Sequence, residues 1–151
     1  MNDQLTTQIK ERFNLSIPAY HITQRAKNEH KGNRKKIFYQ NKALLKQITS
    51  DWNNPSIFSI IGYQTAVGWH THTLISDIPP SIGLFGLEEV SKRYRSYVSQ
   101  FSALSDKRYQ SFNGILITQL NDELALCRCF NYLINHTKFN KLYESLGGFR
   151  G

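Results

Sequence analysis

The sequence predicts an α+β domain with a ferredoxin-like antiparallel sheet, built in the order βαββαβ, and one extra helix at its C-terminal end. Two observations lead to this fold class. Four short stretches have the composition and patterning of strands, and three longer ones repeat apolar residues at helical spacing. Along the chain the order is strand, helix, strand, strand, helix, strand, helix. The 151 residues, 40% of them hydrophobic, suit one globular domain spanning 1–151.

The first half of the chain is expected to contain a strand, a helix and a hairpin. AYHITQR, residues 19–25, reads as a strand because it alternates along one face and contains β-branched residues. Residues 41–52 place apolar side chains at helical spacing, and Asn53-Asn54-Pro55 ends that pattern. IFSIIGYQTAVG (57–68) and WHTHTLIS (69–76) together predict a β-hairpin.

The second half is expected to supply two helices with a strand between them. One apolar stripe runs from Leu87 to Phe101 and predicts a long helix, which a polar loop over 102–113 follows. GILITQL (114–120) reads as a strand, and DELALCRCFNYLINH (122–136) as a capped helix. At the other end, apolar residues every four positions in the segment up to Leu15 predict a short helix or an arm.

The charge of the chain favours a polyanionic partner. Nineteen Lys and Arg against eleven Asp and Glu give a net charge of +8, which suits nucleic acid better than an anionic membrane. Residues 24–36 predict a solvated basic loop with one acid, Glu29, and the long helix carries further cations. These candidate DNA-binding residues are Arg25, Lys27, Lys31, Arg34, Lys35, Lys36, Lys92, Arg93 and Arg95. Solvation of the surface is the competing interpretation of such a run.

Membrane and secretory classes are disfavoured by the same sequence. No apolar run approaches the roughly 20 residues that span a bilayer, and MNDQLTTQIKERF lacks the apolar stretch of a signal peptide. Cys127 and Cys129 are two apart in a predicted helix, so their side chains diverge and cannot readily form a disulfide. We therefore expect a cytoplasmic protein that has no contact with a membrane.

Two pairs of residues have spacings suited to chemistry. His70 and His72 are two apart on a predicted strand, so both imidazoles project from one face, roughly 7 Å apart along the chain, and can share a metal. Tyr132 and His136 are four apart on a predicted helix, on the side away from Leu126, Cys127, Phe130, Leu133 and Ile134. Taken singly, each pair is more commonly structural: half-buried histidines in one case, a helix-end histidine near the C-terminal dipole in the other.

Together the four residues suit phosphodiester transfer. A tyrosine hydroxyl can attack phosphorus and keep the phosphate as a covalent ester, so no external energy is needed. A divalent metal held by His70, His72 and His136 would polarise the phosphate oxygen and offset the charge that develops. Imidazole ligands tilt the expected ion from Mg²⁺ towards Mn²⁺.

With these residues, most of the chain resembles the REP-associated tyrosine transposases and the related single-tyrosine transposases of small insertion sequences, which belong to the HUH superfamily. AYHITQR with the later Ile37-Phe38 is similar to the opening motif of that family. GYQTAVGWHTHTLIS is similar to its His-hydrophobic-His hairpin, VSKRYRSYVSQF to its basic second helix, and CFNYLINHTKFNKL to its closing tyrosine motif. The chain departs from the pattern at Thr71, at Gly68-Trp69, at His136 where relatives more often have Asn or Gln, and at Thr137.

The resemblance implies an enzyme that nicks and rejoins single-stranded DNA, at hairpins, through a 5′-phosphotyrosine on Tyr132. It also implies a homodimer in which the tyrosine helix can complete the partner's site. Trp69, Tyr94 and Tyr97 are candidates for stacking on bases, although the stripe favours Tyr94 and Tyr97 as core, and His21 is interpreted as a structural strand histidine. Two alternatives remain: a rolling-circle replication or relaxase-type initiator, and a non-catalytic DNA hairpin-binding module.

Overall fold

The computed structural model describes residues 15–52, 55–79, 86–107, 114–137 and 149–150, and it confirms the α+β class. The elements follow the predicted order, and the fold is compatible with a ferredoxin-like arrangement that carries one more helix at its end. They are β1 (Ala19–Arg25), the short 3₁₀ helix η1 (Asn28–His30), α2 (Arg34–Ile48), β2 (Ser56–Gln64), β3 (Gly68–Ser76), α4 (Gly86–Val98), β4 (Ile115–Leu120), α5 (Glu123–Thr137) and β5 (Phe149–Arg150). The predicted helix or arm before Leu15 lies outside the described residues.

The strands form one antiparallel sheet in the order β4-β1-β3-β2-β5. β3 therefore lies in the middle, with β1 on one side and β2 on the other. In this register His72 is opposite Thr23 of β1, and His70 is opposite Arg25 of β1 and Gly62 of β2. This register determines which side chains of β1 and β2 lie beside the two histidines of β3.

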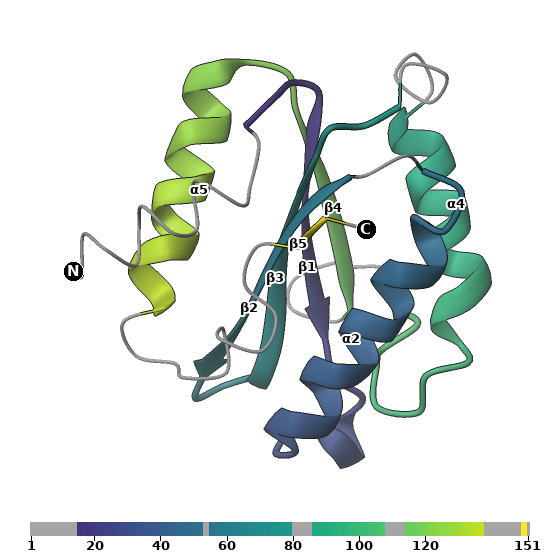
Figure 1. The fold of residues 1–151 in the computed structure, drawn as a ribbon. Helices are drawn as coiled ribbons and strands as arrows, with labels where there is room; N and C mark the ends of the chain where they lie inside the picture. Colours follow the sequence, from purple (N-terminus) through teal and green to yellow (C-terminus); the bar gives the residue numbers. More distant parts are fainter. Residues whose placement is uncertain (1–14, 53–54, 80–85, 108–113, 138–148, 151) are drawn as a thin grey trace.

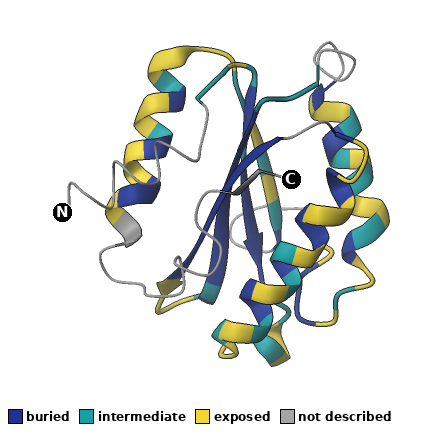
Figure 2. Ribbon diagram, in the orientation of Figure 1, coloured by how far each residue is buried: buried dark blue, intermediate teal, exposed yellow. Residues whose placement is uncertain are grey.

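Helices cover both faces of the sheet, as Figure 1 shows: α2 and α4 pack on one face and α5 on the other. Because side chains alternate along a strand, β1 to β4 each contribute to both layers. The larger core includes Tyr20 and Ile22 and lies beneath α2 and α4. The smaller core joins the sheet to α5; its buried members are Ala19, Phe58, Ile60, Leu74, Leu126, Phe130, Leu133 and Ile134. Figure 2 shows β1, β2 and β3 largely buried, β4 only partly buried, and the outer helix faces exposed.

The first helix begins earlier and ends earlier than predicted. α2 covers Arg34–Ile48 rather than 41–52, with the side chain of Asn33 accepting a hydrogen bond from the backbone N–H of Lys36 at 3.2 Å. The expected basic loop over 24–36 is thus wrong at both ends, because residues 24 and 25 belong to β1 and residues 34–36 form the first turn of α2. Ile37 and Phe38 are buried and extend the apolar stripe into the basic run.

Two further predictions need correction. In the expected polar loop after α4, Ala103 and Leu104 are buried, and Leu104 pairs with Ala26 in a β-bridge; residues 108–113 lie outside the described part. Cys127, expected among the buried residues of α5, is exposed. The other four apolar positions of the helix fill the stripe, and Cys127 lies at its margin. The helix cap is confirmed, since Asp122 accepts from the backbone N–H of Ala125 at 3.0 Å.

No helix within the described residues is both long and apolar enough to cross a bilayer.

Candidate active site

The predicted histidine pair lies together on the α5 face of the sheet. His70 and His72 alternate along β3 with residues that face the other layer, so both rings project from the same side. Their ring centroids are 4.9 Å apart, with one ring edge-on to the other. Both residues are buried, with 4% and 9% of their surface exposed. The same-face prediction made from their spacing is consistent with this geometry.

Both rings have partners at Nδ1, and for His70 the partner defines where the proton lies. Nδ1 of His70 lies 3.2 Å from the carbonyl oxygen of Gly68. A carbonyl can only accept, so this Nδ1 carries the proton and the lone pair of the neutral ring is on Nε2. Nδ1 of His72 lies 3.2 Å from Nε2 of His21 and 3.4 Å from Oγ1 of Thr23. Metal-binding histidines typically engage their second nitrogen in this way, so the pair fits a role as metal ligands.

His21 is a member of the site that the sequence interpretation undervalued. β1 pairs with β3, and the residues at 21 and 23 face the same layer as His70 and His72. The ring of His21 stacks on that of His72 with centroids 5.4 Å apart. Burial lowers the pKa of His21 below its ordinary value of 6.5, which favours the neutral ring at pH 7. A neutral imidazole can accept a hydrogen bond from Nδ1 of His72 in the tautomer in which that nitrogen carries the proton.

Gly62 leaves space beside His70. It is the β2 residue in register with His70, and a Cβ placed on it would lie 3.4 Å from Nε2 of His70 and 3.9 Å from Cδ2 of His72. Any larger side chain at this position would therefore press against the atom through which His70 would bind a metal. The only signal for this in the sequence is a glycine inside an otherwise apolar strand.

Tyr132 reaches the histidines from α5. Its neighbours Leu133 and Ile134 are buried in the smaller core, whereas Tyr132 is 48% exposed. Its ring stands edge-on to the ring of His72 with centroids 6.0 Å apart. The packing of α5 on the sheet thus places an accessible phenol beside a metal-binding type of side chain, although the two residues are 60 positions apart in the sequence.

The predicted third ligand, His136, falls on the last turn of α5, one helical turn after Tyr132. Its side chain lies outside the part of the chain that the structure describes. Among the described side chains, no group of three His, Cys, Asp or Glu is arranged to hold a metal ion. His70 and His72 thus account for two ligands of the predicted set.

The basic residues near β1 lie at the end of the sheet where the histidines are. Arg25 is buried at the end of β1, opposite His70, and Lys27 and Lys31 follow it. The guanidinium of Arg34 lies over the ring of Trp69 at 5.4 Å, and Lys35 is exposed on the first turn of α2. Lys36 on the same turn is partly exposed.

The three cations predicted on the second helix have a different setting. Lys92, Arg93 and Arg95 are on α4, across the sheet from the histidines (Figure 1). Arg93 binds the carboxylates of Asp51 and Glu89 and also donates to the carbonyl oxygen of Ile48 at 2.9 Å. Arg93 therefore links α4 to the end of α2, and its predicted role on DNA is the least supported of the nine.

The aromatic candidates divide in the same way. Tyr94 is fully buried, as the stripe predicted, and its hydroxyl donates to Oδ1 of Asn41 at 3.4 Å. Tyr97 is partly exposed and packs against the larger core. Trp69 is also partly exposed, with its ring centroid 5.0 Å from that of the exposed Tyr63. Of the three predicted aromatic residues, Trp69 is the one whose setting still suits contact with a base.

Comparison with protein-family models, with curated proteins and with solved structures gives no match. Function is therefore inferred from the site and from the sequence motifs.

Proposed function

We propose that this chain is a metal-dependent single-strand DNA transesterase of the tyrosine transposase type. The observation that carries the proposal is the contact between Tyr132 and His72, which brings a candidate nucleophile and a candidate metal ligand together from separate elements. Tyr132 is half exposed beside a buried pair of histidines, so its hydroxyl is open to a substrate while the rings that would hold a metal are fixed within the fold.

The proposed reaction is a reversible exchange of phosphoesters. The phenolic oxygen of Tyr132 forms a bond to phosphorus, and the bond from phosphorus to the 3′ oxygen breaks. The phosphate stays on the 5′ end of the downstream strand as a phosphotyrosine. The phenol gives up its proton, and the leaving 3′ oxygen of the upstream strand takes one up to become a hydroxyl. Attack by a 3′ hydroxyl on the phosphotyrosine reverses these steps and rejoins DNA without an external energy source.

The residues of the site have separate tasks in this scheme. A divalent ion, Mg²⁺ or Mn²⁺, would be held by His70, His72 and the predicted ligand His136, and when bound it supplies polarisation of the scissile phosphate. Exposure of Tyr132 lets a DNA strand reach the hydroxyl. His21 would accept from Nδ1 of His72 and so hold that ring with Nε2 towards the ion, and Gly62 leaves room beside Nε2 of His70.

The substrate class follows from charge and access. Arg25 lies opposite His70, and the basic run that follows it continues to the first turn of α2, which packs on the other face of the sheet. These residues can neutralise backbone phosphates around that end of the sheet. Single-stranded DNA with a hairpin is the substrate that the resemblance favours. A binding module without catalysis remains the second candidate, because the same basic residues would serve it.

Formation of a covalent adduct tests the proposal. The protein is incubated with labelled single-stranded hairpin oligonucleotides and Mn²⁺ and then analysed by denaturing electrophoresis, which removes noncovalent complexes. We expect a labelled protein band in the parent and none in Tyr132→Phe, which loses the phenolic oxygen and keeps the ring. Tyr39→Phe is the matched control, because Tyr39 is 49% exposed on α2, on the other face of the sheet.

Two results would refute the proposal. An adduct that persists in Tyr132→Phe would move the nucleophile elsewhere. Absence of an adduct with every hairpin and with both metals, in a protein that still binds those hairpins, would favour the binding module.

A further inference from the structure

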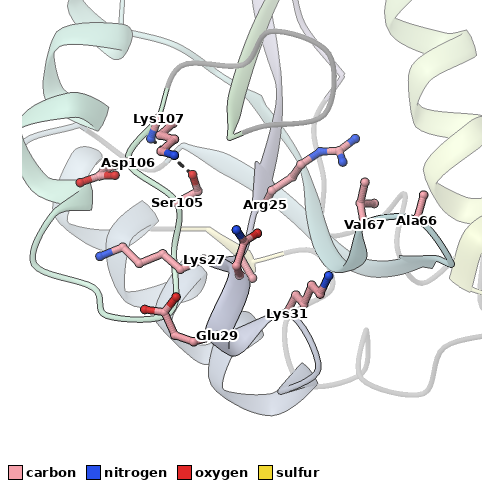
Figure 3. Close-up of a pocket in the computed structure, with 11 residues that line it drawn as sticks. Arg25, Lys27, Glu29, Lys31, Ala66, Val67, Ser105, Asp106 and Lys107 are labelled. Atoms are coloured by element: carbon pink, nitrogen blue, oxygen red, sulfur yellow. Dashed lines mark hydrogen bonds between the residues drawn. The ribbon is translucent and has the colours of Figure 1, made fainter.

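A hollow of about 500 Å³ lies at the end of β1, beside the candidate active site. Three segments surround it, as Figure 3 shows: residues 25–31, the turn between β2 and β3 at Ala66 and Val67, and residues 105–107 after α4. These segments are far apart in the sequence. The hollow is within the size range of pockets that hold small ligands, and it has room for one nucleotide.

Backbone hydrogen bonds hold the three segments in place. The N–H of Ser105 donates to the carbonyl oxygen of Arg25 at 2.9 Å, and the N–H of Lys27 donates to that of Ala103 at 2.9 Å. On the other side, the N–H of Trp69 donates to the carbonyl oxygen of Lys31 at 2.9 Å. The walls are therefore tied to the sheet on both sides, so the hollow exists before any ligand binds.

Gly68 allows the closest of these approaches. It has a φ of +78°, which favours glycine, and a Cβ at this position would lie 2.7 Å from the carbonyl oxygen of Lys31. The turn can pack against the segment after β1 because residue 68 has no side chain. This accounts for a glycine directly before Trp69, where the resemblance led us to expect another turn.

The lining of the hollow is mainly cationic. Arg25, Lys27, Lys31 and Lys107 line it together with two acids, Glu29 and Asp106, so the formal balance is four positive charges against two negative. Arg25 is 6% exposed, whereas Lys31, Lys107 and both acids are exposed at the rim. A buried guanidinium among lysines suits an anion with several oxygens, above all a phosphate.

The hollow also lies next to the histidines. Arg25 is the cross-strand partner of His70, and residues directly opposite in an antiparallel pair have Cα atoms about 5 Å apart. A strand whose scissile phosphate lies at His70 and Tyr132 would therefore bring a neighbouring nucleotide to Arg25.

We infer that this hollow binds the phosphate of one unpaired nucleotide, next to the scissile phosphate of the same DNA strand. The inference rests on the proposed function and adds a residue to it, because Lys107 is not among the predicted DNA-binding residues. A free nucleotide also carries a phosphate, so the experiment includes a test that distinguishes a nucleotide within a DNA strand from a free one.

The test uses Tyr132→Phe as background, so that cleavage does not disturb binding. The probe is the labelled hairpin oligonucleotide that binds most tightly among those of the adduct test. One linkage of its single-stranded flank at a time is replaced by a neutral methylphosphonate, and affinity is measured by fluorescence anisotropy. We expect one or two linkages at which the loss of charge weakens binding about tenfold, the scale of one charge-assisted hydrogen bond.

Alanine at Lys27 and Lys107 should reduce the dependence on charge at those linkages, because two of the four cations of the hollow are gone. Lys46→Ala is the matched control, since Lys46 is an exposed lysine of α2 outside the hollow, and it should leave the dependence intact. Equal dependence in the double variant and its background would overturn the inference. So would an effect of Lys46→Ala as large as that of the double variant.

Competition by thymidine 5′-monophosphate tests whether the hollow binds a free nucleotide. We expect it to compete poorly with the oligonucleotide, because it lacks the rest of the strand. Micromolar competition that disappears in the double variant would overturn the inference in favour of a free nucleotide. The two proposals fail separately. If the parent forms an adduct but the lysines do not affect the charge dependence of binding, only the inference about the hollow is rejected. If the lysines affect the charge dependence but no adduct forms, only the catalytic proposal is rejected.

Discussion

Nε2 of His21 lies 3.2 Å from Nδ1 of His72, and the two rings are stacked. The contact joins β1 to β3 behind the side of His72 that would face a metal. It supports the ring of His72 from behind. In the tautomer in which Nδ1 of His72 donates to His21, the basicity of Nε2 depends on a residue that is not itself a predicted ligand.

His21→Ala should therefore weaken metal binding by about 10- to 100-fold, the usual effect of removing a partner behind a ligand. Calorimetric titration with Mn²⁺ measures this without reference to cleavage. His21→Gln keeps an acceptor at the position and should recover part of the affinity. His30→Ala, in η1, serves as the control, and equal affinities in all four proteins would remove His21 from the site.

The ligand assignment makes its own prediction. His70→Ala and His72→Ala should abolish cleavage while DNA binding changes little, because the residues that bind the DNA phosphates are different ones. His136→Asn should retain some activity, since relatives place an amide at that position. Cleavage rates with Mg²⁺ and with Mn²⁺ decide the matter, and three fully active single variants would show that the ligands are wrong.

Gly62→Ala separates function from stability. The added methyl would contact Nε2 of His70 at 3.4 Å, so we expect weaker Mn²⁺ binding and slower cleavage. The free energy of unfolding should stay within about 1 kcal/mol of the parent value or rise slightly, because alanine lowers the entropy of the unfolded chain. Urea denaturation and metal titration of the same sample measure both quantities. Unchanged metal affinity would show that the space beside His70 is not used.

Salt dependence locates the DNA. Alanine at Lys31, Arg34, Lys35 and Lys36 should weaken hairpin binding and lower the slope of log affinity against log salt, by about 0.7 to 0.9 for each phosphate that the protein no longer neutralises. Lys92→Ala with Arg95→Ala changes charge on α4, across the sheet, and should change the slope less. If the α4 pair has the larger effect, the DNA runs along α4 rather than past residues 31–36.

Arg93→Ala should reduce stability rather than DNA affinity. Its guanidinium holds the pKa of Asp51 below the ordinary value of 3.8, mainly through a hydrogen bond. A carboxyl with a lowered folded-state pKa stabilises the fold above its unfolded pKa, and this stabilisation is lost as pH falls through the folded value. The variant should be about 1 kcal/mol less stable at pH 7, and the difference should shrink below about pH 4. Arg95→Ala, on the same helix, is the control in urea denaturation, and a difference that stays constant down to pH 2 would exclude Asp51 as the cause.

The element order could be predicted from the sequence because periodicity is a local property, and the strands, hairpin and helices all have it. The start of α2 could not be predicted, because a run of charged residues such as 34–36 is typical of a loop. Only the burial of Ile37 and Phe38 shows that the helix begins there. Alternation alone places His70 and His72 on one face. In contrast, the contacts of His72 with His21 and of His70 with Gly62 depend on the register of β3 with its two neighbours, which no local pattern specifies.

The position of Tyr132 also depends on contacts between elements that are distant in the sequence. Its helical offset from the buried residues of α5 predicts an accessible side chain, but not which strand it faces. The resemblance supplied the expected pairing with the histidines, and the packing of Phe130 against Phe58 brings the helix to that place on the sheet. The cationic hollow could not be predicted because its three walls are joined only by tertiary contacts.

The central place of β3 in the sheet has a consequence for hydrogen exchange. Strands flank it on both sides, so the backbone around His70 and His72 is hydrogen-bonded to β1 and to β2 at once. Exposing those amides to solvent requires β3 to separate from β1 or from β2, so we expect their exchange to follow global unfolding. In contrast, β4 pairs only with β1 among the described strands, and we expect its amides to exchange through smaller openings. The histidines would then keep their spacing through the local fluctuations of the native state, and an incoming ion would meet two ligands already in position.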